Sequence, residues 1–423
     1  MKNSNFGKFM LLWAGELISS IGGGLTSFGL GVYVFNQTGS AAGMAIVTLL
    51  GFLPTLILSV PAGVLADRYD RRILMMIGDG CSGLGIIYIL ICMMTGEASL
   101  WQICLGVFVS AAFSALLEPS YRATISDMLT KEEFSKASGL VSLAGSARYL
   151  FSPVLAGLLL SLSDVKLLLI IDICTFFITL LSTAVVRKNI EAKTVEKTDS
   201  FMESMKEGWR VLRAKKGVLL LVLVTSAICL FMGMFQVLAE PFFLSFTDAG
   251  TLGIAESVSA CGMLVSGVFL GIKGIKKHYV RILSISLAFA GVNMALFGLK
   301  QDAFIPCIFG FLFFASLPFA NNCLDYLTRT NIPTELQGRV WGMIGFLSQL
   351  GYVIAYGISG IAADLLGNVS GGGVGRGAGI VMLIAGICLA LIALSMLSIK
   401  SIKALETHEE GEDIPVQSQI SKA

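Results

Sequence analysis

The sequence predicts an all-α integral membrane protein that crosses the bilayer twelve times, and composition and pattern support this together. Of the 423 residues, 55% are hydrophobic and only 14% are charged, whereas soluble domains carry roughly 25% charged residues. The apolar residues form runs of about 20, the length that a helix needs to cross the hydrocarbon core. A soluble globule could not bury this much apolar surface, so an ordinary cytosolic enzyme is excluded.

The predicted spans follow one another in two sets of six. In the first half of the chain they cover 9–35, 41–66, 73–95, 99–121, 138–161 and 165–186. In the second half they cover 217–246, 251–272, 280–299, 303–327, 340–365 and 378–399. Four prolines inside spans are kink candidates, because neighbouring helices can satisfy the carbonyl groups that a proline leaves free: Pro54, Pro153, Pro241 and Pro318.

The distribution of basic residues predicts how the spans are oriented. If the N-terminus is cytoplasmic, most of the 30 Lys and Arg residues fall on the cytoplasmic side, and only Lys166, Lys300 and Arg376 fall outside. Arg148 lies within a span. Since cytoplasmic loops carry the excess of basic residues, this distribution predicts an even number of spans with both termini in the cytoplasm of a cell-membrane protein.

The longest polar segment divides the spans into two predicted bundles. We expect four regions: an N-terminal six-helix bundle at 1–190, a cytoplasmic linker at 191–216, a C-terminal six-helix bundle at 217–400, and a disordered cytoplasmic tail at 401–423. Helical spacing in the linker predicts either an amphipathic helix on the membrane surface or a solvated linker helix; the residues are Phe201, Met205, Trp209 and Leu212. The glycine-rich run 371–379 is interpreted as a flexible connector in the last outer loop.

Enzyme and metal-binding motifs are missing from the sequence. It contains no P-loop, no G-x-S-x-G and no H-E-x-x-H. The nine cysteines lie in apolar stretches without a C-x-x-C pair, so neither a disulfide nor a zinc site is predicted. The net charge of +2 does not indicate nucleic-acid binding. We therefore predict that the protein is not an enzyme, needs no cofactor, and has no ATPase or nucleic-acid partner.

The most specific motif follows the second span and reads Gly63-Val-Leu-Ala-Asp67-Arg68-Tyr69-Asp70-Arg71-Arg72. It resembles the loop G-x-L-x-D-R-x-G-R-R of the major facilitator superfamily, with Asp70 in place of the usual glycine. Together with Asp79, this variant resembles the macrolide-efflux and siderophore-exporter branch. The resemblance extends to the two sets of six spans, to Glu207-Gly-Trp-Arg in the linker and to Gly338-Arg339-Val-Trp-Gly. It implies two pseudo-symmetric bundles that rock around a midplane site.

The resemblance also implies a conformational latch that stabilises the outward-facing state, formed by Gly63, Asp67, Arg68, Arg71 and Arg72. Asp67 ends a helix and is expected to face the N-terminus of the eleventh span, where unpaired N–H groups favour an anion. The arginines are expected to bridge to nearby acidic groups such as Asp127. The alternative is that these charges only set the topology.

A second motif lies in the fifth span, where exporters of the superfamily carry a glycine, a spacer and G-P-x-x-G-G. Here Ser152 and Ala156 replace two of the glycines. Small residues at this spacing allow helices to approach closely, and a proline can bend the helix. The predicted gate motif consists of Gly145, Ser152, Pro153 and Gly157. The alternative is ordinary close helix packing.

Ionisable side chains inside spans are costly and often functional. The candidates are Glu16, Asp79, Glu118, Arg148, Asp172, Glu240, Glu256 and Asp325. In the family, spans one, four, seven and ten line the central cavity. This implies a set for proton coupling and substrate binding, with the charge of Arg148 balanced by Glu16 or Glu118: Glu16, Glu118, Arg148, Glu240 and Asp325.

Other interpretations of these ionisable residues stay open. Asp79 and Asp172 are interpreted as structural. Asp325 is four residues before Arg329, so the two can form an ion pair on one helix. Glu256 can instead reach the outer headgroups.

The resemblance implies a secondary transporter that exports a drug-like or amphiphilic small molecule, such as a macrolide-type compound, in exchange for protons. The alternatives are a lipid or lysolipid flippase or a siderophore exporter on the same fold. Weaker alternatives are a non-transporting membrane sensor and a substrate importer.

Overall fold

A computed structural model describes residues 5–130, 133–187, 216–332 and 337–406; of these, the side chains of residues 60, 67, 135, 216–218 and 337–343 are not described. The first half of the chain forms α1 (Phe6–Thr38), α2 (Ala41–Arg68), α3 (Arg71–Thr95), α4 (Leu100–Ser114), α5 (Leu117–Met128), α6 (Phe134–Leu162) and α7 (Val165–Arg187). The second half forms α9 (Lys216–Leu244), α10 (Ala249–Lys273), α11 (Tyr279–Phe297), α12 (Ile305–Asn331), α13 (Gln337–Ser370), α14 (Gly373–Met396) and the short α15 (Lys400–Lys403).

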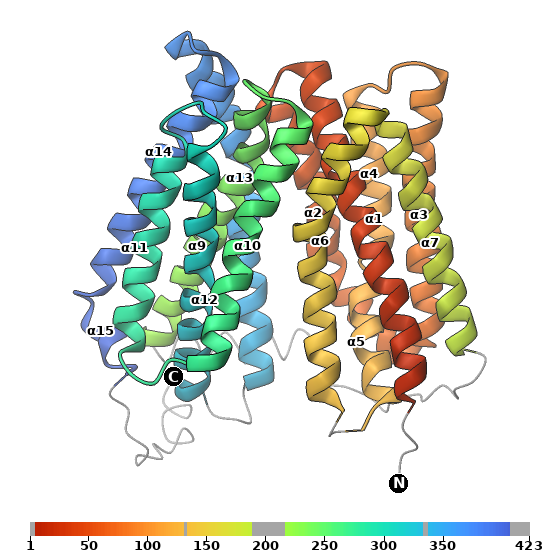
Figure 1. The fold of residues 1–423 in the computed structure, drawn as a ribbon. Helices are drawn as coiled ribbons and strands as arrows, with labels where there is room; N and C mark the ends of the chain where they lie inside the picture. The colour runs from red at the N-terminus through yellow and green to blue at the C-terminus, as the bar shows by residue number, and fades with distance from the viewer. Residues whose placement is uncertain (1–4, 131–132, 188–215, 333–336, 407–423) are drawn as a thin grey trace.

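The predicted all-α architecture is confirmed. The described part of the chain contains 12 helical segments that are long and apolar enough to cross a membrane, and they form two bundles side by side (Figure 1). The proposed linker helix around Trp209 and the tail beyond Glu406 lie outside the described residues.

The fourth span differs from its prediction in length and in continuity. It runs from Leu100 to Met128 rather than over 99–121, and it is interrupted between α4 and α5. Pro119 has no N–H to donate to the carbonyl of Ala115, and its ring would clash with that carbonyl in a regular helix. The helix therefore breaks at 115–116 and restarts at Leu117, and α5 continues past the predicted end of the span to Met128.

The end of the second bundle also differs from the sequence prediction. The expected tail from residue 401 begins with ordered structure, because Ile402 of α15 is fully buried against the second bundle, with Leu405 partly buried beside it. The glycine-rich run is not a flexible connector either, since α14 begins at Gly373 and includes the rest of the run. Gly377 lies against the backbone of α13 at Ala363, and Gly379 lies against the backbone at Gly298. These glycines allow close helix contacts inside the membrane region.

Close packing within the first bundle depends on small residues of α1. Gly22 and Gly29 are seven residues apart and therefore lie on one face of the helix. A side chain at Gly22 would meet Thr175, and one at Gly29 would meet Leu168, both on α7. The glycines let α1 approach α7 closely, which positions the polar residues of these two helices beside one another.

The two bundles meet at one end of the molecule and diverge toward the other (Figure 1). We call the end where α1 begins and α3 starts the Arg71 end, and the opposite end, where α13 finishes, the Asp364 end. The bundles contact each other through α6 and α10 and through α2 and α13. Hydrogen bonds from α2 to Asp364 and from Ser257 of α10 to Leu150 of α6 place this contact toward the Asp364 end.

Candidate functional site

The loop between α2 and α3 is held by charge pairs within the first bundle. Asp70 accepts a hydrogen bond from the backbone N–H of Arg72 at 3.0 Å and so caps α3. Its other carboxylate oxygen pairs with Nε of Arg187 on α7 at 3.2 Å. These contacts explain why aspartate suits the position where the superfamily motif usually has glycine. Asp70 ties the start of α3 to the end of α7.

Of the three arginines that were expected to bridge to nearby acidic groups, Arg71 pairs with Asp127. Its Nη1 lies 2.6 Å from Oδ2 of Asp127, and both side chains are largely buried, with 12% and 21% exposed. Arg71 also donates to the carbonyls of Ala66 and Ala123. One guanidinium therefore joins the end of α2, the start of α3 and the last turns of α5.

The structure gives less information on the remaining residues of the predicted latch. Arg72 is buried with 2% exposure, Arg68 is exposed, and Gly63 has open space where a side chain would stand. The side chain of Asp67 lies outside the described residues, as do the side chains of the first residues of α13.

At the opposite end of the same helix pair lies a carboxylate that the sequence did not single out. Asp364 of α13 accepts hydrogen bonds from Oγ of Ser40 at 2.5 Å, from the N–H of Ala41 at 2.9 Å and from the N–H of Ala42 at 3.1 Å. Its charge therefore lies against the N-terminus of α2, where unpaired N–H groups favour an anion. All three hydrogen bonds join the second bundle to the first.

Close backbone contact surrounds Asp364. Gly360, one turn earlier on α13, lies against the backbone of α2 at Ala41 and Ala42. Deeper along the helices, Phe52 of α2 packs against Tyr352 and Tyr356 of α13, with ring centroids 5.7 Å and 5.6 Å apart. The sequence could indicate Ser40 as a helix start, because a serine before an apolar run is a helix-start signal. It could not indicate Asp364, which lies one residue from the predicted end of its span, because no sequence pattern connects Asp364 with Ser40.

The motif of α6 provides the second contact between the bundles. Gly157 lies against the backbone of Ala249, and the carbonyl of Pro153 lies against Gly253 of α10. Ser152 is buried and donates to the carbonyl of Ile21 on α1 at 3.0 Å. The motif thus faces two helices.

Gly145, the remaining residue of the predicted gate motif, has open space around it. It takes no part in either of these contacts.

Ionisable residues of the first bundle gather between α1, α6 and α7. Arg148 of α6 has its aliphatic stem against Gly24 of α1 and interacts electrostatically with Glu16 and with Asp172. Asp172 is buried and accepts a hydrogen bond from Oγ1 of Thr26 at 2.6 Å. Arg148 therefore lies within electrostatic range of Glu16, one of the two acids expected to balance its charge. It also lies within range of Asp172, which the sequence suggested was only structural.

Asp79 of α3 is buried, with 1% exposure, and neither of its carboxyl oxygens has a hydrogen-bond partner among the described residues. Glu16 acts on it electrostatically, and on Tyr121 of α5, whose hydroxyl is likewise buried without a described partner. Burial of a polar group without a partner is costly, so close packing alone does not explain a carboxyl group at this position.

The second bundle brings two carboxyl groups together. Glu240 of α9 and Glu256 of α10 interact electrostatically, and both are half-buried. The carboxyl group of Glu240 also occupies the space that a side chain at Gly31 of α1 would fill, so it lies at the contact of the two bundles. Glu256 faces this acidic neighbour, which does not fit the alternative that it extends to the outer headgroups.

The two remaining candidate acids form ion pairs on their own helices. Glu118 pairs with Arg122 at 2.7 Å, and Asp325 pairs with Arg329 at 3.8 Å, with more than half of each side chain exposed. For Asp325 this is the alternative that the i,i+4 spacing allowed. Glu118 also lies within electrostatic range of Glu16, but its ion pair is with Arg122 rather than Arg148.

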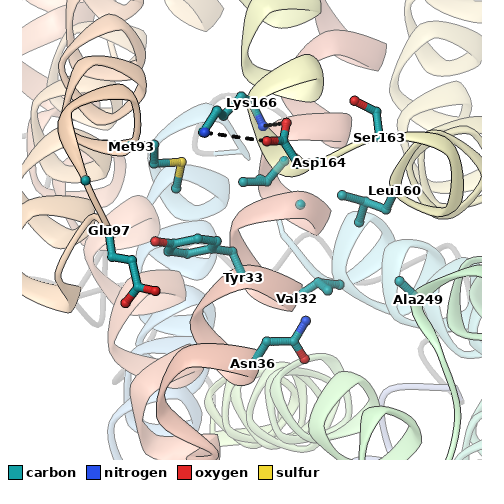
Figure 2. Close-up of a pocket in the computed structure, with 13 residues that line it drawn as sticks. Val32, Tyr33, Asn36, Met93, Glu97, Leu160, Ser163, Asp164, Lys166 and Ala249 are labelled. Carbon is teal, nitrogen blue, oxygen red and sulfur yellow. Dashed lines mark hydrogen bonds and ion pairs between the residues drawn. The ribbon is translucent and has the colours of Figure 1, made fainter.

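A pocket of about 420 Å³ opens at the Asp364 end (Figure 2). Tyr33 and Asn36 of α1, Glu97 after α3 and Lys166 of α7 line it, and Ala249 of α10 forms a wall from the second bundle. Within it, Nζ of Lys166 lies 3.6 Å from Oδ2 of Asp164. None of the predicted site residues lines this pocket.

These observations define a class of protein: two six-helix bundles that close against each other at one end and carry ionisable residues along their inner helices. A family model described as the Major Facilitator Superfamily matches residues 12–356. The chain therefore belongs to this superfamily of membrane transporters, and it is a multi-pass membrane protein rather than an enzyme.

Individual relatives and solved structures agree with this membership. Macrolide efflux protein A of Streptococcus pyogenes is 28% identical over 368 residues, covering 85% of this chain and 90% of that protein. The enterobactin exporter EntS of Shigella flexneri is 26% identical, with 91% of each chain covered. Among solved structures, a bacterial homologue of the iron transporter ferroportin, in an inward-facing state, has a TM-score of 0.73 at 14% identity, covering 94% of this chain and 100% of that chain.

Proposed function

We propose that this transporter exports an amphiphilic, drug-like small molecule in exchange for protons by alternating access. The observation that supports alternating access is the closure of the two bundles at the Asp364 end while they diverge toward the Arg71 end (Figure 1). The direction and the kind of cargo are supported by the relatives, which are named as efflux and export proteins. With the Arg71 end in the cytoplasm, as the basic residues predict, the structure is inward-facing.

Two carboxylates on the α2–α13 pair suit opposite states of this cycle. Asp364, near the end of α13, caps the N-terminus of α2 and would stabilise the inward-facing state. Asp67, near the end of α2, would face the N-terminus of α13 when the Arg71 end closes. Each carboxylate is stabilised by the N-terminus of the opposite helix only when the two are in contact, so one of the two pairs contributes in each state. The closing of one end would then offset the opening of the other.

The proposed proton-coupling group is Glu16 with its neighbours Arg148, Asp172 and Asp79. Two of these acids share the one positive charge of Arg148, so the site has more carboxyl groups than it can keep ionised away from water. A proton bound at Glu16 would free Arg148 to pair with Asp172 alone. A change of state that exposes Glu16 to the other side would release that proton, which couples proton entry to the rocking of the bundles.

A siderophore exporter is the second candidate, because EntS is a relative of similar coverage. A catecholate siderophore is anionic, whereas macrolide-type compounds carry an amine. A cationic amine could replace the proton of a carboxyl group in the pair Glu240 and Glu256 at the contact of the bundles, whereas an anion would find no counter-charge there. This favours the cationic amphiphile. A lipid flippase is separated by the same assay, because its cargo stays in the bilayer.

Transport by the purified protein in proteoliposomes tests the proposal. Efflux of macrolides, other cationic amphiphiles and catecholate siderophores is measured with and without an imposed pH gradient. We expect gradient-dependent transport of a cationic amphiphile, and its loss in Glu16→Gln. The matched control is Asp325→Asn, whose exposed ion pair with Arg329 lies in the other bundle and outside the proposed group. Equal transport with and without the gradient for every compound would contradict proton coupling, and retained coupling in Glu16→Gln would contradict the assignment.

A further inference from the structure

A second pocket lies at the Arg71 end of the second bundle, and none of the residues named in the proposed function lines it. It has a volume of about 650 Å³ and is lined by the first turn of α11, by Tyr326 of α12 and by the segment around α15. Tyr279 and Tyr326 stack with ring centroids 3.7 Å apart and form one wall. Since no site residue discussed above lines it, the transport function does not explain its composition.

The lining of this pocket is strongly basic. Four cationic side chains contribute to it, together with His278 and the single acid Glu406: Lys276, Lys277, Arg281 and Lys403. All four cations are exposed, and none forms an ion pair with another residue in the described ranges. Four unpaired positive charges around one hollow repel each other unless an anion occupies it. The pocket therefore has the chemistry of an anion-binding site.

The surface next to the pocket indicates what kind of anion reaches it. On α11, Arg281 is followed at helical spacing by the exposed apolar side chains Ile285, Phe289 and Val292, which are 51%, 45% and 49% exposed. On a membrane-spanning helix this stripe faces hydrocarbon, so Arg281 marks the level at which the headgroups begin. A ligand with acyl chains on that stripe would place its phosphate among the basic side chains.

We propose that this pocket binds the headgroup of an anionic phospholipid, with its acyl chains along the exposed stripe of α11. Basic pockets between transmembrane helices on the cytoplasmic side suit acidic lipid headgroups. The stacked tyrosines suit the same depth, because aromatic rings favour the boundary between hydrocarbon and water. The bound lipid joins α11, α12 and α15, three elements of one bundle, and stabilises their arrangement at this end.

Retention of lipid by the purified full-length protein tests the proposal. The protein is reconstituted in vesicles of dioleoyl phosphatidylcholine with a rising share of dioleoyl phosphatidylglycerol, and the retained lipids are measured by mass spectrometry after extraction. The test variant is R281Q/K403Q, which removes one cation from each side of the pocket. The matched control is K273Q/K400Q, which removes two exposed cations of the same bundle and the same end that do not line it.

We expect the wild type to prefer phosphatidylglycerol, and R281Q/K403Q to lower that preference roughly 30-fold, since each basic group at a membrane surface contributes about fivefold. The control variant should change it only a few-fold, and 10 mM inorganic phosphate should not displace the lipid. Equal effects of the two variants would show that the charges act only through the overall potential and overturn the proposal. Displacement by inorganic phosphate would overturn it in favour of a soluble anion. No preference in the wild type would overturn it in favour of an unfilled pocket or one filled by the acidic residues after Glu406.

Discussion

Helices α2 and α13 meet in different ways at their two ends. At the Asp364 end, a single carboxylate of one bundle accepts three hydrogen bonds from the other, and glycine allows backbone contact beside it. At the Arg71 end, the described ion pairs join helices of the same bundle, namely α3 with α5 and α3 with α7. The contacts at the Asp364 end join the two bundles, whereas the ion pairs at the Arg71 end join helices within the first bundle.

This difference suggests how a rigid bundle can move against its partner. Backbone contacts and a part-buried cap depend on ångström-scale fit, so a small rotation removes them together. Long arginine side chains that pair inside their own bundle keep their contacts during such a rotation. We therefore expect substitutions at the Asp364 end to change which state is populated, and substitutions of the Arg71 pairs to change the stability of the first bundle.

The largest effect is expected where α6 meets α10. A side chain at Gly253 would collide with the carbonyl of Pro153, so Gly253→Val should hold the Asp364 end open. Overpacking of a tight contact costs ~1–3 kcal/mol, which corresponds to a loss of transport of about 5- to 150-fold. The measurement is initial efflux rate in proteoliposomes. Gly267→Val on the same helix is the control, because open space surrounds that glycine; equal losses in both variants would contradict the closure at Gly253.

The next effect concerns Asp364. Asp364→Ala removes the acceptor of three hydrogen bonds, and bonds to a charged group contribute ~1.5–3 kcal/mol, so the outward-facing population should rise about 10- to 100-fold. We would measure labelling of a cysteine at Ala45, which is 3% exposed, by an impermeant reagent in a cysteine-free background. Asp302→Ala is matched, because Asp302 accepts from backbone N–H groups at the same end but within one bundle. Unchanged labelling in Asp364→Ala would remove its proposed role.

A smaller effect is expected on the stability of the first bundle. Arg71→Gln and Asp127→Asn should each lower it by about 1.5–3 kcal/mol, since their charge-assisted bond is largely buried. The double variant should be little worse than either single variant. Thermal unfolding of the purified variants completes the double-mutant cycle. Arg122→Gln, which breaks an exposed pair, should cost only ~0.3–0.5 kcal/mol; the same loss for both arginines would contradict the distinction between buried and exposed pairs.

The smallest effect concerns the start of α10. The backbone N–H of Thr251 donates to Asp248 at 2.7 Å, and this bond lowers the pKa of the Asp248 carboxyl. A lowered pKa in the folded state stabilises the protein above the unfolded pKa, and this contribution is lost as the pH falls through the folded pKa. Asp248→Ala should cost about 1 kcal/mol or less at pH 7, and less well below the folded pKa, where the neutral carboxyl group is a weaker acceptor. Thermal unfolding at pH 7 and at decreasing acid pH checks this; an equal cost throughout would contradict the charge as its cause.

Much of the fold could be predicted because the bilayer imposes a simple length rule. Apolar runs located the spans, and the pairing of Asp127 with a nearby arginine followed from charges at neighbouring span ends. The break before α5 was missed because a hydropathy pattern does not register the loss of one N–H at Pro119. The ordered start of the supposed tail was missed because Ile402 stands alone in a polar segment, and its burial depends on a surface formed by distant helices.

By itself, the sequence determined the membrane-embedded class, the number of spans and the motif that resembles the superfamily, because these depend on local composition and spacing. Only the tertiary structure decided which charges act together. It brought Asp364 of α13 to the N-terminus of α2, more than 300 residues away in the chain. It put Glu16 and Asp172 near Arg148 and brought Glu240 and Glu256 together in the other bundle. Glu118 and Asp325 were left with partners on their own helices. The physical reason is that a cap or an ion pair needs contact within about 3–4 Å, and the packing of helices sets such distances.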